Sequence, residues 1–421
     1  MFYHLEKSDL QIAKLIHAEI MRQQETLDLI PSENTVSHAV LEALGSPLAN
    51  KYSEGYPGKR YYAGNAVIDQ VEFLAQERAR NVFHLGKEWS VNVQPLSGSP
   101  ANFAVYMALL KPGEKIMGMS LPSGGHLTHG EKVSASGKFF SSAQYNVTRQ
   151  GLIDYEELQK LAHKEKPQII VAGFTAYPRI IDFEAFAKIA GEVNAFFMVD
   201  MAHIAGLVAA GSHPSPFPYA DVVTTTTHKS LRGPRGAIIF SRNDKVFEKN
   251  GKQVVISREI DKAVFPGLQG GPHDNQTAAI AVALHEARKP AFKKYGRQIV
   301  KNAKALAHSL QKLGFELVSG GTENHLMLVD LTNKGISGRE GQDRLEAAGI
   351  IVNRNTVPYD TRSPFDPSGI RLGTPALTTR GMKEREMKIV AGLIQEALAG
   401  DNGRVTAKKV IALCKKFPLP K

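Results

Sequence analysis

Five short apolar runs, with helical patterns between them, constrain the fold of this chain more than any other feature. Each run is four or five residues long, and its apolar or β-branched residues are consecutive rather than alternating. Such runs are typical of strands buried on both faces of a sheet, and helices between them favour parallel pairing. The runs are Ile116–Met119, Ile169–Ala172, Phe196–Val199, Val222–Thr226 and Ala237–Phe240. We therefore expect an α/β domain with a mainly parallel sheet between two layers of helices.

Patterns on either side of these runs divide the chain into three parts. Ser8-Asp9-Leu10-Gln11 resembles a capping box and predicts a helix start. Further helices are expected at 71–82, 101–110, 154–163, 183–190, 275–287, 303–313 and 387–398, and further strands at 91–94, 315–318 and 325–331. We expect an N-terminal helix and a polar, aromatic arm in residues 1–70, a large α/β domain in residues 71–287, and a smaller α+β domain in residues 288–421.

Composition fits a soluble globular enzyme, and the net charge alone does not identify what the protein binds. The 421 residues are 43% hydrophobic and 22% charged, no apolar run suggests a membrane span, and no export signal precedes the first helix. The single cysteine, Cys414, rules out an internal disulfide and fits a reducing compartment, so we expect a cytoplasmic protein. The net charge is +11, but basic residues are spread among acids, so anionic small molecules explain it as well as nucleic acid does.

The stretch Thr224–Gly236 is the first candidate for chemistry. Its four threonines extend a strand into His228-Lys229, and Gly-Pro-Arg-Gly then turns the chain away. A lysine held at the end of a strand can form a Schiff base if its neighbours lower its pKa. A buried strand with a surface lysine is the alternative, and this stretch alone does not decide between them.

Two other segments follow strands and carry polar groups. Ser97-Gly98-Ser99-Pro100 opens a helix, where free backbone N–H groups suit a phosphate, although an N-cap without a ligand is the commoner case. Asp200 ends a buried strand, and it could pair with a protonated pyridine nitrogen. Asp200 and His203, or His126 and His129, could instead bind a metal, but no zinc-type spacing supports this.

Together, a phosphate cradle, a strand-end aspartate and a strand-end lysine on one sheet are what pyridoxal phosphate needs. With that combination in view, the chain closely resembles the serine hydroxymethyltransferase family, a group of fold-type I enzymes dependent on pyridoxal phosphate. The segments that carry the resemblance are Asn50–Tyr62, Gln94–Asn102, Gly124–Gly130, Asp200–His203, Thr224–Gly236, Gln269–Pro272 and Val352–Thr374.

The resemblance implies roles for individual residues. Lys229 would bind the cofactor aldehyde, Asp200 the ring nitrogen and Arg371 the substrate carboxylate, with Ser32 nearby. The other implied cofactor residues are Ser97, Gly98, Ser99, His126, Thr175, His203, Thr226, His228 and Arg235, with Tyr52, Gly270 and Gly271 from a neighbouring subunit. Among them, His203 would lie near the phenolic oxygen of the cofactor. Glu54, Tyr61 and Tyr62 match the positions that handle protons and the substrate hydroxyl, and Glu54 is expected to move the proton that releases the hydroxymethyl group. The implied folate residues are Leu121, Gly125, His126, Leu127, Asn355, Ser363, Pro364 and Phe365.

The resemblance also implies the reaction and the partners. It implies reversible conversion of L-serine and tetrahydrofolate to glycine and 5,10-methylenetetrahydrofolate, in a homodimer with a shared site and without a resident metal or a required nucleic acid. Four departures from the family pattern affect folate contact and subunit packing rather than the reaction: Thr175, Ala63-Gly64-Asn65, Pro122-Ser123 and His273-Asp274-Asn275.

Two other functions compete with this interpretation. A folate-independent aldolase on the same fold needs Lys229 and Arg371 but no folate pocket, so Asn355 and Ser363–Phe365 favour the transferase. An RNA-binding protein would use the positive charge, and its binding would fall steeply with salt. No motif in the sequence requires the second alternative.

Overall fold

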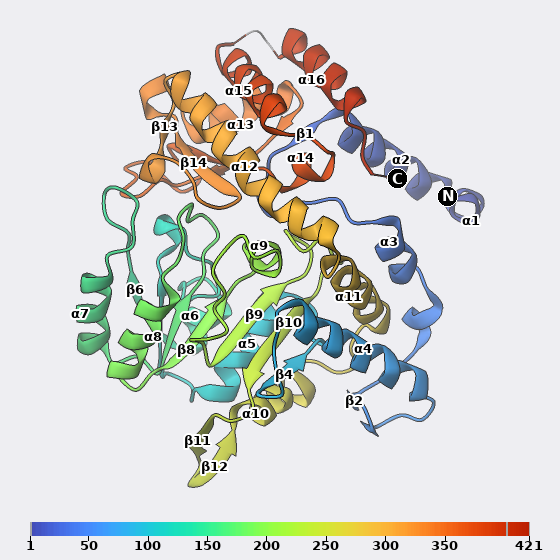
Figure 1. Cartoon of the computed structure of the whole chain (residues 1–421), viewed down its shortest axis with the longest axis vertical. Coiled ribbons are helices and arrows are strands. Elements are labelled where there is room, and N and C mark those ends of the chain that lie inside the picture. The colour runs from blue at the N-terminus through green and yellow to red at the C-terminus, as the bar shows by residue number, and fades with distance from the viewer. Residues whose placement is uncertain (1, 401–402, 421) are drawn as a thin grey trace.

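The computed structural model describes residues 2–400 and 403–420, and its centre is a seven-stranded sheet (Figure 1). The strand order is β4-β10-β9-β8-β7-β5-β6, and only β10 runs antiparallel to its neighbours. The strands are β4 (Trp89–Asn92), β5 (Lys115–Met119), β6 (Ser141–Tyr145), β7 (Ile169–Ala172), β8 (Phe196–Asp200), β9 (Val222–Thr226) and β10 (Ala237–Arg242). The predicted mainly parallel α/β sheet is confirmed.

Consecutive apolar residues arise because successive side chains of each strand point into two different cores. Met198 and Val222 pack with helices α5 and α10 on one face, whereas Val199 and Val223 pack with α4, α7, α8 and α11 on the other. The helices are α4 (Ala66–Val82), α5 (Gly98–Leu109), α7 (Tyr155–Glu165), α8 (Phe183–Glu192), α10 (Ile256–Lys262) and α11 (Asp274–Ala287). The result is the expected three-layer α/β/α arrangement.

A second core surrounds a four-stranded antiparallel sheet of order β13-β14-β17-β16. These strands are β13 (Glu316–Leu317), β14 (Leu326–Asp330), β16 (Asn353–Asn355) and β17 (Gly369–Gly373). The helices of this part are α12 (Pro290–Lys312), α13 (Gly338–Ala347), α14 (Pro375–Thr379), α15 (Glu384–Leu398) and α16 (Arg404–Lys416). Leu27 and Leu29 also belong to this core, and β1 (Leu27–Asp28) pairs in parallel with β15 (Ile350–Ile351), so part of the N-terminal region packs with the C-terminal one.

Several further α-helices and two β-hairpins lie outside the two large sheets. They are α1 (Tyr3–Ser8), α2 (Leu10–Glu25), α3 (His38–Leu44), α6 (Ala135–Phe139), α9 (Ala205–Ala209), and the hairpins β2 (Gly55–Tyr56) with β3 (Lys59–Arg60) and β11 (Val246–Lys249) with β12 (Lys252–Val255). The predicted capping box is one residue out of place: Asp9, not Ser8, caps α2, because its carboxylate accepts from the backbone N–H groups of Gln11 and Ile12. Ser8 instead ends α1.

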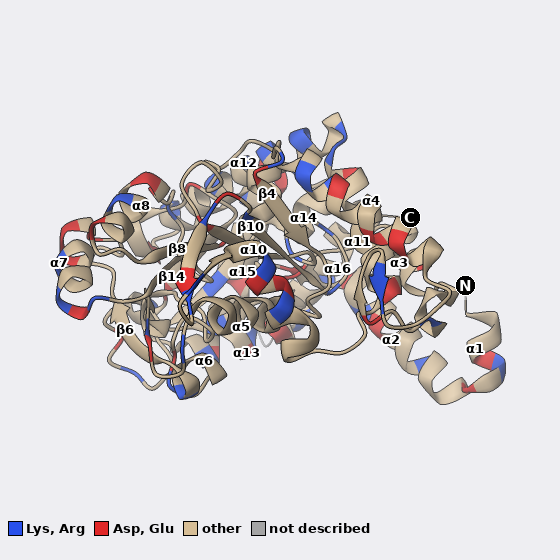
Figure 2. Cartoon of the chain, turned by 90° about the horizontal axis from the view of Figure 1, so that it is seen from below, with Lys and Arg blue, Asp and Glu red and all other residues tan. Residues whose placement is uncertain are grey.

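Acidic and basic side chains are intermixed over the helices (Figure 2). No helix within the described ranges is both long and apolar enough to span a membrane. The spread of basic residues seen in the sequence therefore persists in three dimensions, and charge alone does not mark a nucleic-acid surface.

Arg60 fixes the arm to helix α4. Its guanidinium donates to Asp69 Oδ1 at 2.9 Å, to Glu72 Oε2 at 2.7 Å and to the carbonyl oxygens of Ser53 and Gly55 at 2.9 and 2.8 Å. The side chains of Arg60 and Glu72 are only 4% and 3% exposed. Burial raises the pKa of Glu72 even beside this guanidinium.

Replacing Arg60 by methionine is expected to lower the free energy of unfolding by about 3 kcal/mol, because it leaves a buried carboxylate without its cation. We expect no larger loss of stability, because Glu72 can take up a proton and keeps its hydrogen bonds from Gln94. Urea unfolding at one fixed protein concentration measures the change. Lys160→Met, which removes an exposed ion pair with Glu157, is the control and should leave the unfolding curve unchanged. Equal stability of Arg60→Met and the wild type would contradict this account.

Candidate active site

A cavity of about 490 Å³ lies at the carboxyl ends of the parallel strands, under the second sheet. This is the usual ligand site of open α/β sheets, because the loops after several strands meet there. Its lining residues are Ser32, Glu33, Ser97, Gly98, Ser99, Leu121, Gly125, His126, Leu127, His129, Phe174, Thr175, Asp200, Ala202, His203, Thr226, His228, Lys229, Arg235, Asn355 and Arg371. The structure therefore brings together most of the residues that the sequence singled out.

Lys229 follows strand β9 and projects its amine into this cavity. Its Nζ donates to Thr226 Oγ1 at 2.8 Å. Burial lowers the pKa of Lys229 to about 8; Asp200 opposes this shift, and the positive charges of Arg371 and Arg235 add to it. The chain turns away tightly, because a Cβ at Gly233 would lie 2.9 Å from the Thr227 carbonyl oxygen. About a tenth of the Lys229 amine is thus unprotonated at pH 7.

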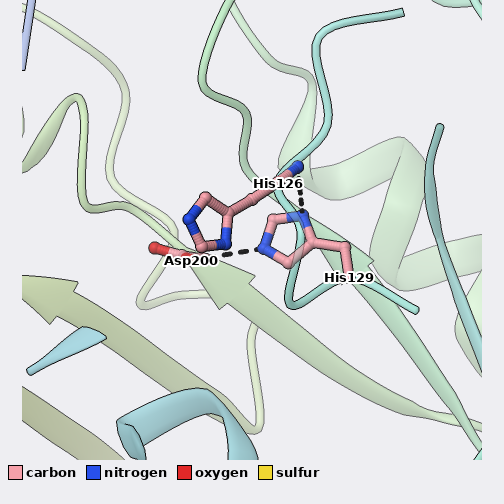
Figure 3. A group of neighbouring side chains, drawn as sticks. All are labelled: His126, His129 and Asp200. Carbon is pink, nitrogen blue, oxygen red and sulfur yellow. Dashed lines mark hydrogen bonds and ion pairs between the residues drawn. The ribbon is translucent and has the colours of Figure 1, made fainter. Parts of the chain in front are cut away.

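Asp200, the last residue of strand β8, lies deep in the cavity. Its Oδ2 accepts from His129 Nε2 at 3.2 Å (Figure 3). The same oxygen accepts from Asn102 Nδ2 at 2.8 Å, and Oδ1 accepts from the backbone N–H of Ala202 at 3.0 Å. Burial alone would raise the pKa of Asp200, but the hydrogen bonds from His129 and Asn102 hold it below its usual range. Thr224 Oγ1 donates to Asn102 Oδ1 at 2.6 Å and so fixes which end of that amide faces Asp200. The carboxylate is kept ionised and can pair with a cationic N–H group.

His126, His129 and Asp200 could in principle bind a metal, since one ligand atom of each lies within 4.8 Å of the others (Figure 3). The hydrogen bonds favour a different interpretation. His129 Nδ1 accepts from the backbone N–H of His126 at 3.4 Å, so the ring proton belongs on Nε2, where it is donated to Asp200. Lys229 and Arg371 also line the cavity and would repel a cation. We therefore interpret the three residues as a hydrogen-bonded group that contacts the ring of a ligand.

The N-terminus of helix α5 supplies donors at one side of the cavity. Ser97 is its N-cap, yet the Ser97 hydroxyl makes no hydrogen bond to the helix. A Cβ at Gly98 would lie 2.7 Å from Thr226 Cγ2, so only glycine lets the helix start approach strand β9 this closely. His228 Nδ1 is buried without a partner among the described residues, and Arg235 lines the same cavity. Free N–H groups, hydroxyls and a guanidinium are a donor set for a phosphate.

Arg371 reaches the cavity from the second sheet, on strand β17. Its Nε donates to Asn353 Oδ1 at 3.2 Å, and its Nη1 donates to the Thr175 carbonyl oxygen. Burial lowers the pKa of Arg371 to about 10. No acidic side chain within 2–400 or 403–420 forms an ion pair with it. A buried guanidinium without a carboxylate partner is suited to a carboxylate on a ligand.

A second group of predicted residues lies outside this cavity. The Tyr52 hydroxyl donates to Glu54 Oε1 at 3.3 Å, the Tyr52 and Tyr62 rings are 4.9 Å apart, and a Cβ at Gly270 would lie 2.9 Å from Glu54 Oε1. We call Tyr52, Glu54, Tyr61, Tyr62, Gly270 and Gly271 the arm cluster. Its tyrosines are 54%, 82% and 48% exposed, in chain order. Within one chain, the arm cluster does not complete the cavity.

Only some of the predicted folate residues line the cavity. Leu121, Gly125, His126, Leu127 and Asn355 line the cavity. Ser363, Pro364 and Phe365 are exposed and do not line it, and Phe365 is 79% exposed. They follow strand β16, whose last residue, Asn355, lines the cavity.

The departures from the family pattern have structural roles. The Thr175 hydroxyl donates to the Gly125 carbonyl oxygen at 2.9 Å, so it still acts as a donor. Asp274 accepts from Ser53 Oγ at 2.7 Å, and Asn275 Nδ2 donates to the Leu44 carbonyl oxygen at 2.8 Å. Both bonds tie the arm region to helix α11. Ser123 Oγ donates to Asn146 Oδ1 at 3.1 Å, and Asn65 Nδ2 donates to the Tyr62 carbonyl oxygen at 2.8 Å.

Known proteins match this chain along almost its whole length. The sequence model of the serine hydroxymethyltransferase family matches residues 5–394. A serine hydroxymethyltransferase of Desulfotalea psychrophila is 57% identical over 420 residues, which cover 99% of this chain and 96% of the relative. Those of Acidothermus cellulolyticus and Desulforapulum autotrophicum are 56% and 54% identical, over 99% and 98% of this chain and 97% and 96% of their own. The similarity therefore includes both the cavity and the arm cluster.

Proposed function

Because the chain belongs to the serine hydroxymethyltransferase family, we propose that the cavity around Lys229 is the site of that family's reaction. The protein is a pyridoxal phosphate-dependent transferase that interconverts serine and glycine with tetrahydrofolate. The observation that carries the assignment of the site is that Lys229, Asp200, Arg371 and the start of helix α5 all line one cavity. Each supplies one chemical group that the cofactor or the amino acid requires.

The residues of the cavity fit pyridoxal phosphate group by group. The α5 N-terminus with Ser97 and Ser99 would hold the phosphate, Asp200 the ring nitrogen and Lys229 the aldehyde, while His126 would cover the ring. When bound, the cofactor supplies an electron sink for the electron pair released as a bond at the amino acid α-carbon breaks. The ionised Asp200 keeps the ring nitrogen protonated, which maintains that sink.

The other residues orient the substrate and move protons. Arg371 binds the carboxylate of serine, and Ser32 lies at the same cavity. Lys229 Nζ, unprotonated in part near neutral pH, is the nucleophilic amine of the site and can later carry a proton. Glu54 accepts the hydroxyl proton of serine as the hydroxymethyl group leaves. Leu121, Leu127 and Asn355 border the space for tetrahydrofolate, and Ser363–Phe365 extend that border.

Serine cleavage with and without tetrahydrofolate tests this assignment of function. We expect rapid conversion of serine to glycine only when tetrahydrofolate is present. Comparable rates in both conditions would instead indicate a folate-independent aldolase. Binding to RNA that survives removal of the cofactor would indicate the second alternative.

We further propose a homodimer whose active sites are shared. The arm cluster is exposed and separate from the cavity in one chain, so a second copy of the chain can supply Tyr52, Glu54, Gly270 and Gly271 to it. Closed two-fold symmetry would complete both sites at once. The division of the chain into residues 1–70, 71–287 and 288–421 fits this arrangement, with the first part as the contact to the partner.

We propose a cytoplasmic location, supported by Cys414, a buried free cysteine.

Mixed dimers test the shared site. Lys229→Ala and Glu54→Gln homodimers should each be inactive, because every site lacks one group. After both chains are refolded together in equal amounts, about a quarter of the wild-type activity should return, since half of the dimers are mixed and each has one intact site. Mixing Lys229→Ala with Asp200→Asn is the matched control: both defects lie in the same cavity, so no activity should return. Absence of recovery in the first mixture would contradict sharing.

The protonation of Lys229 predicts how the cofactor-free protein takes up pyridoxal phosphate. Only the neutral amine reacts with an aldehyde, and the Lys229 pKa is about 8. Below that value, the neutral fraction rises about tenfold per pH unit. The association rate should therefore rise about tenfold from pH 6 to pH 7 and level off above pH 8, as followed by absorbance in stopped flow. A rate that keeps rising to pH 10 would show an ordinary lysine.

A further inference from the structure

A buried pair of histidines joins the two sheets beside the active site. His325 precedes strand β14 of the second sheet, and His203 follows strand β8 of the first. His203 Nδ1 and His325 Nε2 are 3.3 Å apart, and the two rings are stacked with an interplanar angle of 30°. The rings are nearly inaccessible, with His325 0% and His203 6% exposed. His203 lines the cavity with Lys229, whereas His325 does not.

The segment that carries His325 is held firmly against the large sheet. The backbone N–H of Glu323 donates to the Pro178 carbonyl oxygen at 2.8 Å, and Asn324 Nδ2 donates to the Tyr177 carbonyl oxygen at 2.9 Å. The backbone N–H of Leu326 donates to Asn324 Oδ1 at 3.0 Å. These bonds fix the His325 ring relative to His203 without using either ring.

Both rings are neutral at physiological pH. Burial lowers the pKa of His325 to about 3, and the charge of Arg371 adds to this shift, with smaller contributions from His213 and Lys229. Burial also lowers the pKa of His203 far below its ordinary value, with further contributions from Lys229, Arg371, His325 and His126. A neutral imidazole has one N–H and one lone pair, so one ring must donate to the other.

The surroundings of His325 select the donor. His325 Nδ1 is buried and has no hydrogen-bond partner among the described residues. A buried N–H group without an acceptor is rarer and costlier than an acceptor without a donor. The proton of His325 therefore belongs on Nε2, where it is donated to His203 Nδ1. His203 then carries its own proton on Nε2, the ring nitrogen that remains for the cavity.

We propose that His325 is a positioning residue that keeps His203 in the tautomer protonated at Nε2, so that His203 donates a hydrogen bond into the cavity. This inference rests on the proposed function for its ligand: the resemblance places His203 near the phenolic oxygen of pyridoxal phosphate, which is an acceptor when ionised. The opposite tautomer would present a lone pair to that oxygen. Through His325, the second sheet, which also carries Arg371, sets the donor that faces the cofactor.

Neutron diffraction of the perdeuterated full-length protein, with and without pyridoxal phosphate, tests the assignment directly. We expect deuterium on Nε2 of both His203 and His325. His213 is an internal reference, because its Nδ1 lies 2.9 Å from the Pro214 carbonyl oxygen and must carry the deuterium there. Deuterium on Nδ1 of His203 would overturn the proposal. Because the cofactor-free crystal already answers the question, this result does not depend on the serine assay.

Two substitutions separate positioning from packing. His325→Gln can keep an amide N–H near the Nε2 position, whereas His325→Leu has a similar size and no donor. We expect kcat to fall about 10-fold in His325→Leu, with little change of KM for serine, and to be largely kept in His325→Gln. His203 should retain deuterium on Nε2 in His325→Gln, and the absorption band of the bound cofactor should shift only in His325→Leu. His308→Leu, on the exposed face of α12, is the control. Equal losses and equal spectra in both His325 variants would overturn the proposal.

Discussion

Replacing Lys229 by alanine is expected to reduce serine cleavage by about 10³-fold or more. The variant loses both the nucleophilic amine and the group that carries a proton at that position. Alanine leaves strand β9 intact, because the strand ends at Thr226 and the Thr227 backbone still bonds to Gly236 and Gly233. The unfolding temperature should therefore change little while turnover is lost.

Borohydride reduction followed by peptide mapping identifies the lysine that holds the cofactor. In the wild type, the reduced pyridoxyl group should appear on the peptide that contains Lys229, and in Lys229→Ala on none. Burial and the neighbouring cations distinguish this amine from the other lysines, because they lower its pKa to about 8. Lys301→Ala, on the exposed face of α12, is the matched control and should keep both the label and the activity. A label on any other lysine would contradict the assignment of Lys229.

The sequence predicts the main sheet well because its strands are buried on both faces. The five apolar runs coincide with β5, β7, β8, β9 and β10 to within two residues at either end. Strand β6 was not predicted, because Ser141-Ser-Ala-Gln-Tyr145 lies at the sheet edge and lacks an apolar run. The sequence does not predict strand β17 either, because Gly369 and Gly373 are its first and last residues and its central residue is the buried Arg371. Glycine and arginine are poor strand signals, yet here they serve the site.

Some residues of the candidate site can be identified from local sequence patterns, whereas others can be identified only from contacts between distant parts of the chain. Lys229 and Asp200 can be found from the sequence because each follows a recognisable strand. The partners that set the charge of Asp200 cannot, since Asn102 and His129 lie 98 and 71 residues away and meet it only in the fold. His325 Nδ1, which has no hydrogen-bond partner within the described part of the chain, is likewise buried only once the two sheets have packed together. The arm cluster shows a further limit, because it lies outside the cavity of one chain and reaches a site only in the dimer that we propose.

Replacing Asp200 by asparagine is the second substitution with a large expected effect. The carboxylate is ionised inside the protein and would face the protonated ring nitrogen of the cofactor. Removing one partner of a buried ion pair costs about 3–5 kcal/mol, which corresponds to about 10²–10⁴-fold in rate if the pair matters most in the transition state. Asparagine adds a second penalty: both oxygens of Asp200 accept hydrogen bonds, from Ala202, Asn102 and His129, and the new amide N–H₂ would face at least one of these donors.

The measurements that isolate this effect are kcat, the affinity for pyridoxal phosphate and the absorption spectrum of the loaded protein. We expect kcat to fall by the larger factor and cofactor affinity by a smaller one, because Lys229 and the α5 N-terminus still hold the cofactor. Asp182→Asn is the control: it also removes one carboxylate, but Asp182 caps helix α8 and asparagine caps equally well. If Asp200→Asn kept kcat within about twofold of the wild type, ring protonation would not depend on this carboxylate, and His129 or a group on the second chain would have to maintain it.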